Sequence, residues 1–176
     1  MKILAFAASN SRKSINKDLI NYAATLLDKH EVDIIDINDY EMPTHSSDLE
    51  EAQGISDAAS RFLKKIEDAD AMLISYAEHN GNYTIAYKNL FDWASHENQK
   101  VYQGKSIVML STSPGPGGAK SVLSLAKESA HFFNGEVQAS LSIPSFYENF
   151  DQEKCELNDT ELASELATVL AALVTH

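Results

Sequence analysis

A run of hydroxyl, amide and cationic side chains is the part of this sequence best suited to binding an anion: Ser9-Asn10-Ser11-Arg12-Lys13-Ser14-Ile15-Asn16. It lies between a short apolar run and a helical pattern, where exposed backbone N–H groups and the positive end of a helix dipole favour negative charge. Arg12 adds a forked donor suited to phosphate oxygens. We therefore expect a phosphate monoester to bind here. The alternative is that Ser14 only caps the helix and the other polar side chains are solvated.

Two further loops are suited to contact with a flat heterocycle. Glu78-His79-Asn80-Gly81 contains Asn-Gly, a strong turn signal, and the exposed amides of such a turn can lie along an aromatic ring system. The run Thr112-Ser113-Pro114-Gly115-Pro116-Gly117-Gly118-Ala119 is rich in glycine, which lets a backbone approach a flat ligand closely, and in proline, which stiffens the approach. Taken alone, the second loop is better explained as an ordinary surface turn, and a plain turn also explains the third.

The sequence lacks the motifs of several other kinds of site. The Walker pattern is absent, and the glycine cluster does not continue as GxGxxG because Lys120 occupies the third glycine position. No GxSxG elbow supports a serine nucleophile. The histidines form no metal-spaced pair such as HExxH, and a single cysteine excludes an intramolecular disulfide framework or a cysteine-rich metal site. We therefore expect no metal ligands.

Short apolar runs alternate with amphipathic helical patterns along the chain, and together they must position the three loops. The runs predict strands at 2–8, 32–37, 71–76, 106–111 and 136–141; the patterns predict helices at about 15–27, 55–66, 84–95, 120–133 and 160–174, with a long loop at 38–54. Strands joined through helices form a parallel sheet with helices on both faces. In such an α/β sheet, ligands bind beyond the carboxyl ends of the strands, where all three loops emerge.

Length and charge narrow the possible partners. At 176 residues the chain is expected to form one domain, residues 1–176. Its 26 acidic and 14 basic residues give a formal net charge of −12, which argues against nucleic acid or anionic lipid as the main partner. No apolar stretch reaches the ~20 residues of a membrane span, and the opening residues lack a convincing cleavage region. We expect a cytoplasmic protein.

The loops, taken together, resemble the NADPH-dependent FMN reductase family of flavodoxin-like proteins. The first loop (residues 9–16) is similar to the family's GSxRxxSxN, and Glu78-His79-Asn80-Gly81 is similar to its PEYNG segment. Lys88-Asn89-Leu90-Phe91-Asp92-Trp93 matches the LKNAIDW helix, and Ser111-Thr112-Ser113-Pro114-Gly115-Pro116-Gly117-Gly118 matches the SxSPGxxGG turn. These matches appear in the family's order over residues 1 to about 135.

The resemblance implies a flavodoxin-like three-layer sandwich with strand order 2-1-3-4-5, and FMN bound noncovalently at the strand ends. Family members take hydride from NAD(P)H and pass electrons to a small acceptor such as a quinone, an azo compound, a free flavin, a metal oxyanion or oxygen. No acid, base or nucleophile is nominated, because the flavin carries the chemistry. The implied cofactor-binding residues are Ser9, Ser11, Arg12, Ser14, Ile15 and Asn16 in the first loop, Ala77, Glu78, His79, Asn80 and Gly81 in the second, and Ser113, Pro114, Gly115, Gly117 and Gly118 in the third.

Several positions depart from the family pattern, among them Asn82, Tyr83 and Ile85, which lie where serine and proline are more usual. Ala8 stands where the family has glycine, Ala77 replaces a proline, and His79 replaces a tyrosine whose ring often lies near the flavin. His79 can either stack on the flavin and add a pH-dependent charge, or be an exposed turn residue. Nicotinamide access and the choice of acceptor therefore stay open.

The helix that contains Tyr87, Phe91 and Trp93 carries more apolar surface than one sheet contact requires. A homodimer or homotetramer would bury the excess, and the resemblance implies the same. The alternative is that the helix is sandwiched between the sheet and a neighbouring loop.

Two rival functions remain at this point. The first is an FMN-binding electron carrier or redox sensor without its own NAD(P)H activity, which the acidic composition favours because carriers dock on basic partners. The second is a flavin-free α/β interaction domain.

Overall fold

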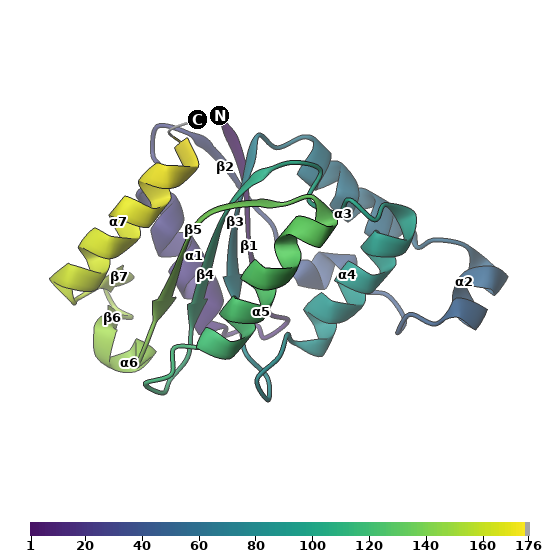
Figure 1. Ribbon diagram of the computed structural model, residues 1–176. Helices are drawn as coiled ribbons and strands as arrows, with labels where there is room; N and C mark the ends of the chain where they lie inside the picture. The colour runs from purple at the N-terminus through teal and green to yellow at the C-terminus, as the bar shows by residue number, and fades with distance from the viewer. Residues whose placement is uncertain (175–176) are drawn as a thin grey trace.

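Five short strands form one parallel sheet in the computed structural model, which describes residues 1–174 (Figure 1). The strands are β1 (Lys2–Ala8), β2 (Glu31–Ile34), β3 (Ala71–Tyr76), β4 (Ser106–Thr112) and β5 (Glu136–Ile143). Their spatial order is β2-β1-β3-β4-β5, and each neighbouring pair is parallel. The predicted α/β fold and strand order are confirmed.

Helices cover both faces of this sheet and bury two separate apolar clusters. α1 (Ile15–Thr25) and α7 (Thr160–Val174) pack on one face, whereas α3 (Asp57–Glu67), α4 (Ile85–Glu97) and α5 (Lys120–Ala130) pack on the other (Figure 1). The central strands are apolar along almost their whole length because both of their faces are covered. Each large apolar side chain buried in this way stabilises the fold by about 1.5–3 kcal/mol.

The second strand is shorter than predicted. β2 ends at Ile34 because Asp36 caps a short 3-10 helix, η1 (Ile37–Tyr40), by accepting a hydrogen bond from the Asn38 N–H at 3.0 Å. Lys17 on α1 forms an ion pair with the same carboxylate. Burial alone would raise the pKa of Asp36, but the hydrogen bonds from Lys17 and Asn38 outweigh it and lower this pKa below 3.8.

The segment 38–54 is not one long loop, so this prediction was wrong. It holds the end of η1 and a seven-residue helix, α2 (Ser47–Gln53). Ser46 caps the start of α2 by accepting from the Leu49 N–H at 3.2 Å, and Gly54 ends it with a φ of +76°. α2 buries none of its residues, so it lacks the apolar periodicity that predicts a helix. Figure 1 shows it beyond α4, at the edge of the molecule.

Smaller differences occur toward the C-terminal end. The last part of the predicted helix 120–133 is a separate 3-10 helix, η2 (His131–Phe133). A four-residue helix, α6 (Phe146–Asn149), and a two-stranded ribbon, β6 (Phe150–Asp151) and β7 (Glu156–Leu157), precede α7. No helix among residues 1–174 is long and apolar enough to cross a membrane.

The apolar face of α4 is covered mainly from within the chain. Tyr87 and Trp93 are buried, and the Trp93 indole N–H donates to the Pro43 carbonyl at 2.8 Å. Phe91 is partly buried against the same core, whereas Ile85 is 75% exposed. Tyr87 and Trp93 are therefore buried within the chain, whereas Ile85 and Phe91 stay at least partly accessible on this helix.

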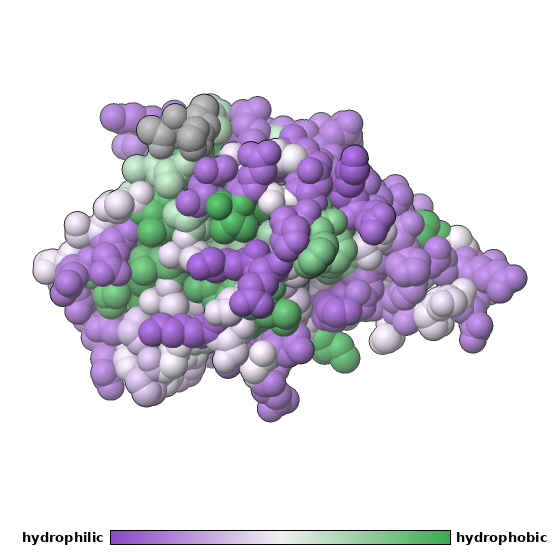
Figure 2. Space-filling model, in the orientation of Figure 1, coloured by the Kyte–Doolittle hydropathy of each residue, from purple (hydrophilic) through white to green (hydrophobic). Residues whose placement is uncertain are grey.

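The face seen in Figure 2 is mostly hydrophilic. Its hydrophobic residues gather along α7 and between α7 and α5, near the edge strand β5. The loops that follow the carboxyl ends of β1, β3 and β4 lie at one end of the molecule, as the topology requires (Figure 1).

Candidate functional site

Asn16 joins the ends of three elements at the base of the first loop. Its side-chain oxygen accepts hydrogen bonds from the Ser75 hydroxyl at 2.7 Å and from the Thr112 N–H at 3.2 Å. Its side-chain nitrogen donates to the Thr112 carbonyl at 3.3 Å, and the residue is only 2% exposed. The amide is thus engaged inside the protein, and Asn16 holds α1 against β3 and β4.

Glu78 ties the second loop to the helix that follows the third loop. Its carboxylate accepts a hydrogen bond from the Val122 N–H at 3.0 Å, in the first turn of α5. Ala119, at the start of α5, has no side chain able to cap that turn, so Glu78 supplies the missing acceptor. Thr84 anchors the other end of this loop by donating to the Ala8 carbonyl at 3.0 Å.

The tip of the second loop is the turn that Asn-Gly predicts. Asn80 and Gly81 have φ angles of 53° and 75°, and the backbones of His79 and Asn82 bond to each other at 2.9 and 3.1 Å. Two successive positive φ angles are the mark of a type I′ turn. His79 is exposed, and within residues 1–174 its side chain makes no hydrogen bond or ring contact.

The third loop is fixed by hydrogen bonds to its own carbonyls. The Gly118 carbonyl accepts from the hydroxyls of Ser111 at 2.7 Å and Ser142 at 2.8 Å. Gly118 has a φ of +60°, and a Cβ atom there would collide with the Ser142 hydroxyl. By contrast, Gly115 and Gly117 face open space, so a flat ligand can approach their backbone.

The residues after β5 brace the third loop. The Ser145 N–H donates to the Gly115 carbonyl at 2.9 Å, and the Phe146 N–H donates to the Ser113 carbonyl at 3.0 Å. The Ser113 hydroxyl adds a bond to the Gly115 carbonyl at 3.2 Å. The loop is therefore held on the side of α6 as well as by β4.

A cleft of about 210 Å³ lies among the three loops. Its lining is Ser11, Lys13, Ser14, Ile15, Asn16, Ala77, Glu78, Thr112, Ser113, Pro114 and Tyr147. Most of these residues belong to the predicted site, which the structure thus brings together from three separate loops. The remaining predicted residues lie outside this lining: Ser9, Arg12, His79, Asn80, Gly81, Gly115, Gly117 and Gly118.

Three lining residues were not predicted. Lys13 and Thr112 lie within the recognised loops, so their side-chain chemistry was a usable signal. Tyr147 belongs to the short helix α6, which no periodic pattern indicates.

The first loop has the charge and the donors that an anion requires. Arg12 and Lys13 are exposed, and neither forms an ion pair with any residue in the described part of the chain. Ser14 precedes α1, and its hydroxyl makes no capping hydrogen bond. The first turn of a helix also presents N–H groups that have no partner inside the helix. These groups fit a phosphate.

Tyrosines line the region behind the second loop. Burial raises the pKa of Tyr76 and Tyr87 well above 10, and it also raises the pKa of Tyr83. The ring centroids of Tyr76 and Tyr83 are 5.8 Å apart, and those of Tyr83 and Tyr87 are 5.3 Å apart. These phenols stay neutral at ordinary pH, so they add no negative charge behind the site.

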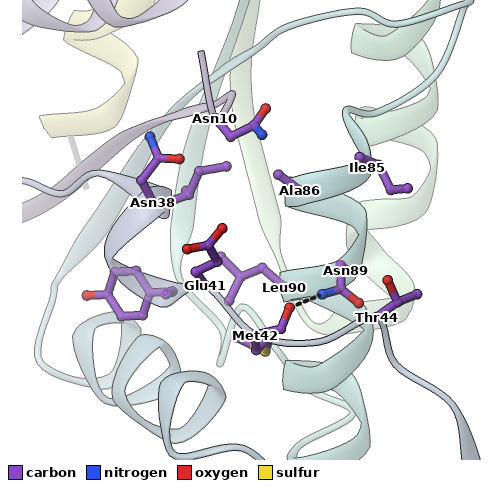
Figure 3. Close-up of a pocket in the computed structure, with 11 residues that line it drawn as sticks. Asn10, Asn38, Glu41, Met42, Thr44, Ile85, Ala86, Asn89 and Leu90 are labelled. Carbon is purple, nitrogen blue, oxygen red and sulfur yellow. Dashed lines mark hydrogen bonds between the residues drawn. The ribbon is translucent and has the colours of Figure 1, made fainter. Parts of the chain in front are cut away.

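A second pocket, of about 190 Å³, lies between η1, the segment that follows it, and α4 (Figure 3). Asn10 of the first loop lines it, together with Asn38, Met42 and Ile85. Asn89 of α4 donates to the Met42 carbonyl at 3.3 Å and so holds one wall in place. No sequence pattern indicated this pocket, because its walls come from segments far apart in the chain.

Comparison with known proteins decides the family. Residues 1–147 match the family model described as NADPH-dependent FMN reductase. The chain belongs to this family. The predictions of an NAD(P)H-dependent flavoenzyme, of FMN as cofactor and of NAD(P)H as co-substrate are thereby confirmed.

Individual relatives of this chain carry related names. An NAD(P)H:quinone oxidoreductase from Solanum tuberosum is 29% identical over 98% of this chain and 91% of its own length. A 2-hydroxy-1,4-benzoquinone reductase from a Burkholderia species is 33% identical over 67% of this chain and 63% of its own length. Among solved structures, the flavoenzyme NAD(P)H:(acceptor) oxidoreductase FerB from Paracoccus denitrificans has a TM-score of 0.78 at 24% identity, covering 98% of this chain and 94% of that one. This last likeness shows the shared flavodoxin-like fold.

Proposed function

We propose that this FMN reductase family member uses NAD(P)H to reduce quinones in the cleft among the three loops. The observation that carries the proposal is that one cleft combines the first loop's hydroxyls and cations with backbone from two other loops. The names of the relatives, two of which act on quinones, support this acceptor class.

The first loop is proposed to hold the phosphate of FMN. Arg12 and Lys13 would supply charge, because neither is neutralised within the described chain. Ser11 and Ser14 would supply hydroxyl donors, and the N-terminus of α1 would add its dipole. Asn16 would act indirectly, by fixing the helix that presents these groups.

The second and third loops are proposed to border the flavin ring. When bound, FMN supplies the capacity to accept a hydride from a nicotinamide and to pass on two electrons. The exposed turn at Asn80 and Gly81, and the open backbone at Gly115 and Gly117, can face a flat ring without side-chain obstruction. No side chain is proposed as an acid or base, because the chain's contribution is binding and orientation.

Two arginine variants test the phosphate assignment. Arg12→Ala removes a proposed ligand, whereas Arg61→Ala removes an exposed arginine on α3 that bonds to the Asp39 carbonyl. Loss of a charged hydrogen bond predicts that Arg12→Ala weakens FMN binding by about 1.5–3 kcal/mol, or roughly 10- to 150-fold. Flavin fluorescence titration measures this, and equal affinities for both variants would remove Arg12 from the site.

An anaerobic titration tests the activity separately. Adding NADPH to the FMN-loaded protein should bleach the yellow oxidised spectrum, and adding 1,4-benzoquinone should restore it. A protein that keeps its oxidised spectrum would be an electron carrier without nicotinamide activity. Restoration by an azo dye but not by the quinone would overturn the proposed acceptor class.

We further propose that the protein is a cytoplasmic single domain that forms a homodimer or homotetramer through α4. Ile85 is 75% exposed on this helix, and Phe91 lines an apolar groove together with Tyr83 and Phe133. Light scattering should give a mass above that of one chain, and Ile85→Asp should lower it. A wild-type mass of one chain would refute the assembly.

One cooperative unfolding transition is expected of a single domain.

A further inference from the structure

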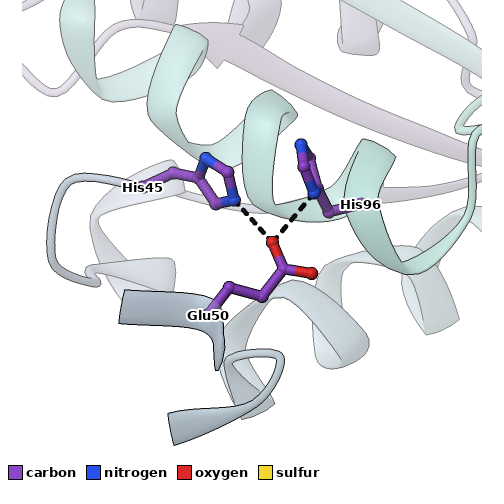
Figure 4. Close-up of side chains that lie close together, drawn as sticks. All are labelled: His45, Glu50 and His96. Atoms are coloured by element: carbon purple, nitrogen blue, oxygen red, sulfur yellow. Dashed lines mark hydrogen bonds and ion pairs between the residues drawn. The ribbon is translucent and has the colours of Figure 1, made fainter. Parts of the chain in front are cut away.

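Three side chains, two from the segment 45–50 and one from α4, meet away from the three loops (Figure 4). Glu50 of α2 places one carboxylate oxygen 2.8 Å from His45 Nε2 and 2.8 Å from His96 Nδ1. All the potential ligand atoms lie within 4.8 Å of one another. This is the only such group of three found among the described residues.

The site is built on a fixed backbone. The His45 N–H donates to the side-chain oxygen of Asn89 at 2.8 Å, and the Trp93 indole donates to the Pro43 carbonyl at 2.8 Å. The rings of His45 and Trp93 meet edge to face with centroids 4.8 Å apart. Because His96 belongs to α4 as well, two of the three groups are held by one helix. α2 contributes the third.

The chemistry of the group matches a zinc ion. Two imidazole nitrogens and one carboxylate are a common ligand set for Zn²⁺, with water in the fourth position. Zinc–ligand bonds of about 2.0–2.2 Å place the ligand atoms of a tetrahedral site roughly 3.3 Å apart. In this group the potential ligand atoms are separated by 2.8 Å in the two nitrogen–oxygen contacts and by no more than 4.8 Å overall, so small side-chain movements would reach that distance.

Solvent can reach the group from one side. The side chains of His45, Glu50 and His96 are 13%, 28% and 47% exposed, so an ion can enter while Trp93 backs the inner ligand. We propose that His45, Glu50 and His96 form a Zn²⁺ site that clamps α2 to α4. The alternative is a hydrogen-bonded cluster that binds no metal.

The clamp would act on the second pocket. Met42 and Thr44 line that pocket, and His45 directly follows Thr44 in the chain. Asn89 bonds both to the His45 N–H and to the Met42 carbonyl, so it links the pocket wall to the proposed metal site. An ion that crosslinks α2 to α4 would therefore restrict the segment between η1 and α2.

Two pairs of variants test the site against matched controls. Glu50→Gln removes a proposed ligand, and Glu51→Gln makes the same charge change at the next, exposed position of α2. His96→Gln removes a second ligand, and the exposed His131 gives the control His131→Gln. Full-length protein is first treated with a chelator, and Zn²⁺ affinity is then measured by competition with a chromogenic chelator.

We expect wild type to bind one zinc ion per chain. Glu50→Gln and His96→Gln should weaken binding at least about tenfold, while both control variants keep the wild-type affinity. Circular dichroism establishes that each variant is folded. Wild type that binds no zinc, or zinc binding that survives in both ligand variants, would overturn the proposal.

A spectroscopic test needs no variant. Trp93 is the only tryptophan in the sequence, and its ring contacts His45. Co²⁺ bound at this site should therefore quench the tryptophan fluorescence strongly, and it should give the visible absorption of a tetrahedral nitrogen and oxygen site. Stoichiometric Co²⁺ binding without quenching would place the ion elsewhere and refute the site.

Discussion

Replacement of Asn16 by alanine gives a direct measure of what holds the three loops together. The change removes three hydrogen bonds, to the Ser75 hydroxyl and to the N–H and carbonyl of Thr112. Each contributes about 0.5–1.5 kcal/mol net, and their partners are buried, so the expected loss of unfolding free energy is about 2–4 kcal/mol. For a chain of this size, that lowers Tm by roughly 4–16 °C.

Urea unfolding of the flavin-free protein, followed by circular dichroism, measures this loss without any contribution from the cofactor. The midpoint should fall while its slope stays unchanged. Asn10→Ala is the matched control, because Asn10 is exposed in the same loop, and it should stay within about 0.5 kcal/mol of wild type. If Asn16→Ala proves as stable as wild type but binds FMN poorly, Asn16 is a ligand of the cofactor, and our account of it as a structural link is wrong.

Three further outcomes are expected. Glu78→Ala should lower the unfolding free energy by about 0.5–2 kcal/mol because the Val122 N–H loses its capping acceptor; an unchanged denaturation midpoint would contradict this. Gly118→Ala should lower the unfolding free energy by about 1–3 kcal/mol, because its Cβ would collide with Ser142 at a positive φ. A melting temperature equal to that of wild type would show that the loop shifts to accommodate the added methyl group. Because the pKa of Asp36 is lowered in the folded state, its stabilisation is present above about pH 4 and is lost at lower pH. The difference in stability between wild type and Asp36→Asn should therefore shrink from pH 6 to pH 3, and a constant difference would refute the assignment.

The sheet and its helices were predictable because their apolar patterns are strong. β1 and β3 are almost continuous apolar runs, and the one-sided apolar pattern of α3 includes Phe62 and Ile66. Patterns of this kind follow from burial, which dominates the free energy of folding. The order of the strands depends on pairing between segments that are far apart in the chain, so it was inferred from the resemblance to a family of known fold.

The elements that failed prediction lack such burial or depend on distant contacts. α2 buries no residue, and only its caps at Ser46 and Gly54 define its ends. Trp93 looked like excess apolar surface because nothing local shows that Pro43, 50 positions earlier, covers it.

The sequence predicted the three loops of the candidate site, but it did not predict the hydrogen bonds that connect them. Glu78 caps a helix 44 positions later, and Asn16 bonds to a strand 96 positions away. The approach of His96 to Glu50 was not predictable for the same reason, since the two residues lie on different elements. Sequence spacing detects ligands that share one turn or helix, whereas these pairs exist only after the sheet has assembled.

The bracing of the third loop by Ser145 and Phe146 bears on how the protein acquires its cofactor during synthesis. A nascent chain released only as far as α5 would have all the residues of the first and second loops but not the support beneath the third. Because Tyr147 also lines the cleft, the cleft can be complete only after the ribosome has extruded that residue. Flavin loading would then belong to the last stage of translation or to the finished polypeptide, and truncated products should emerge colourless.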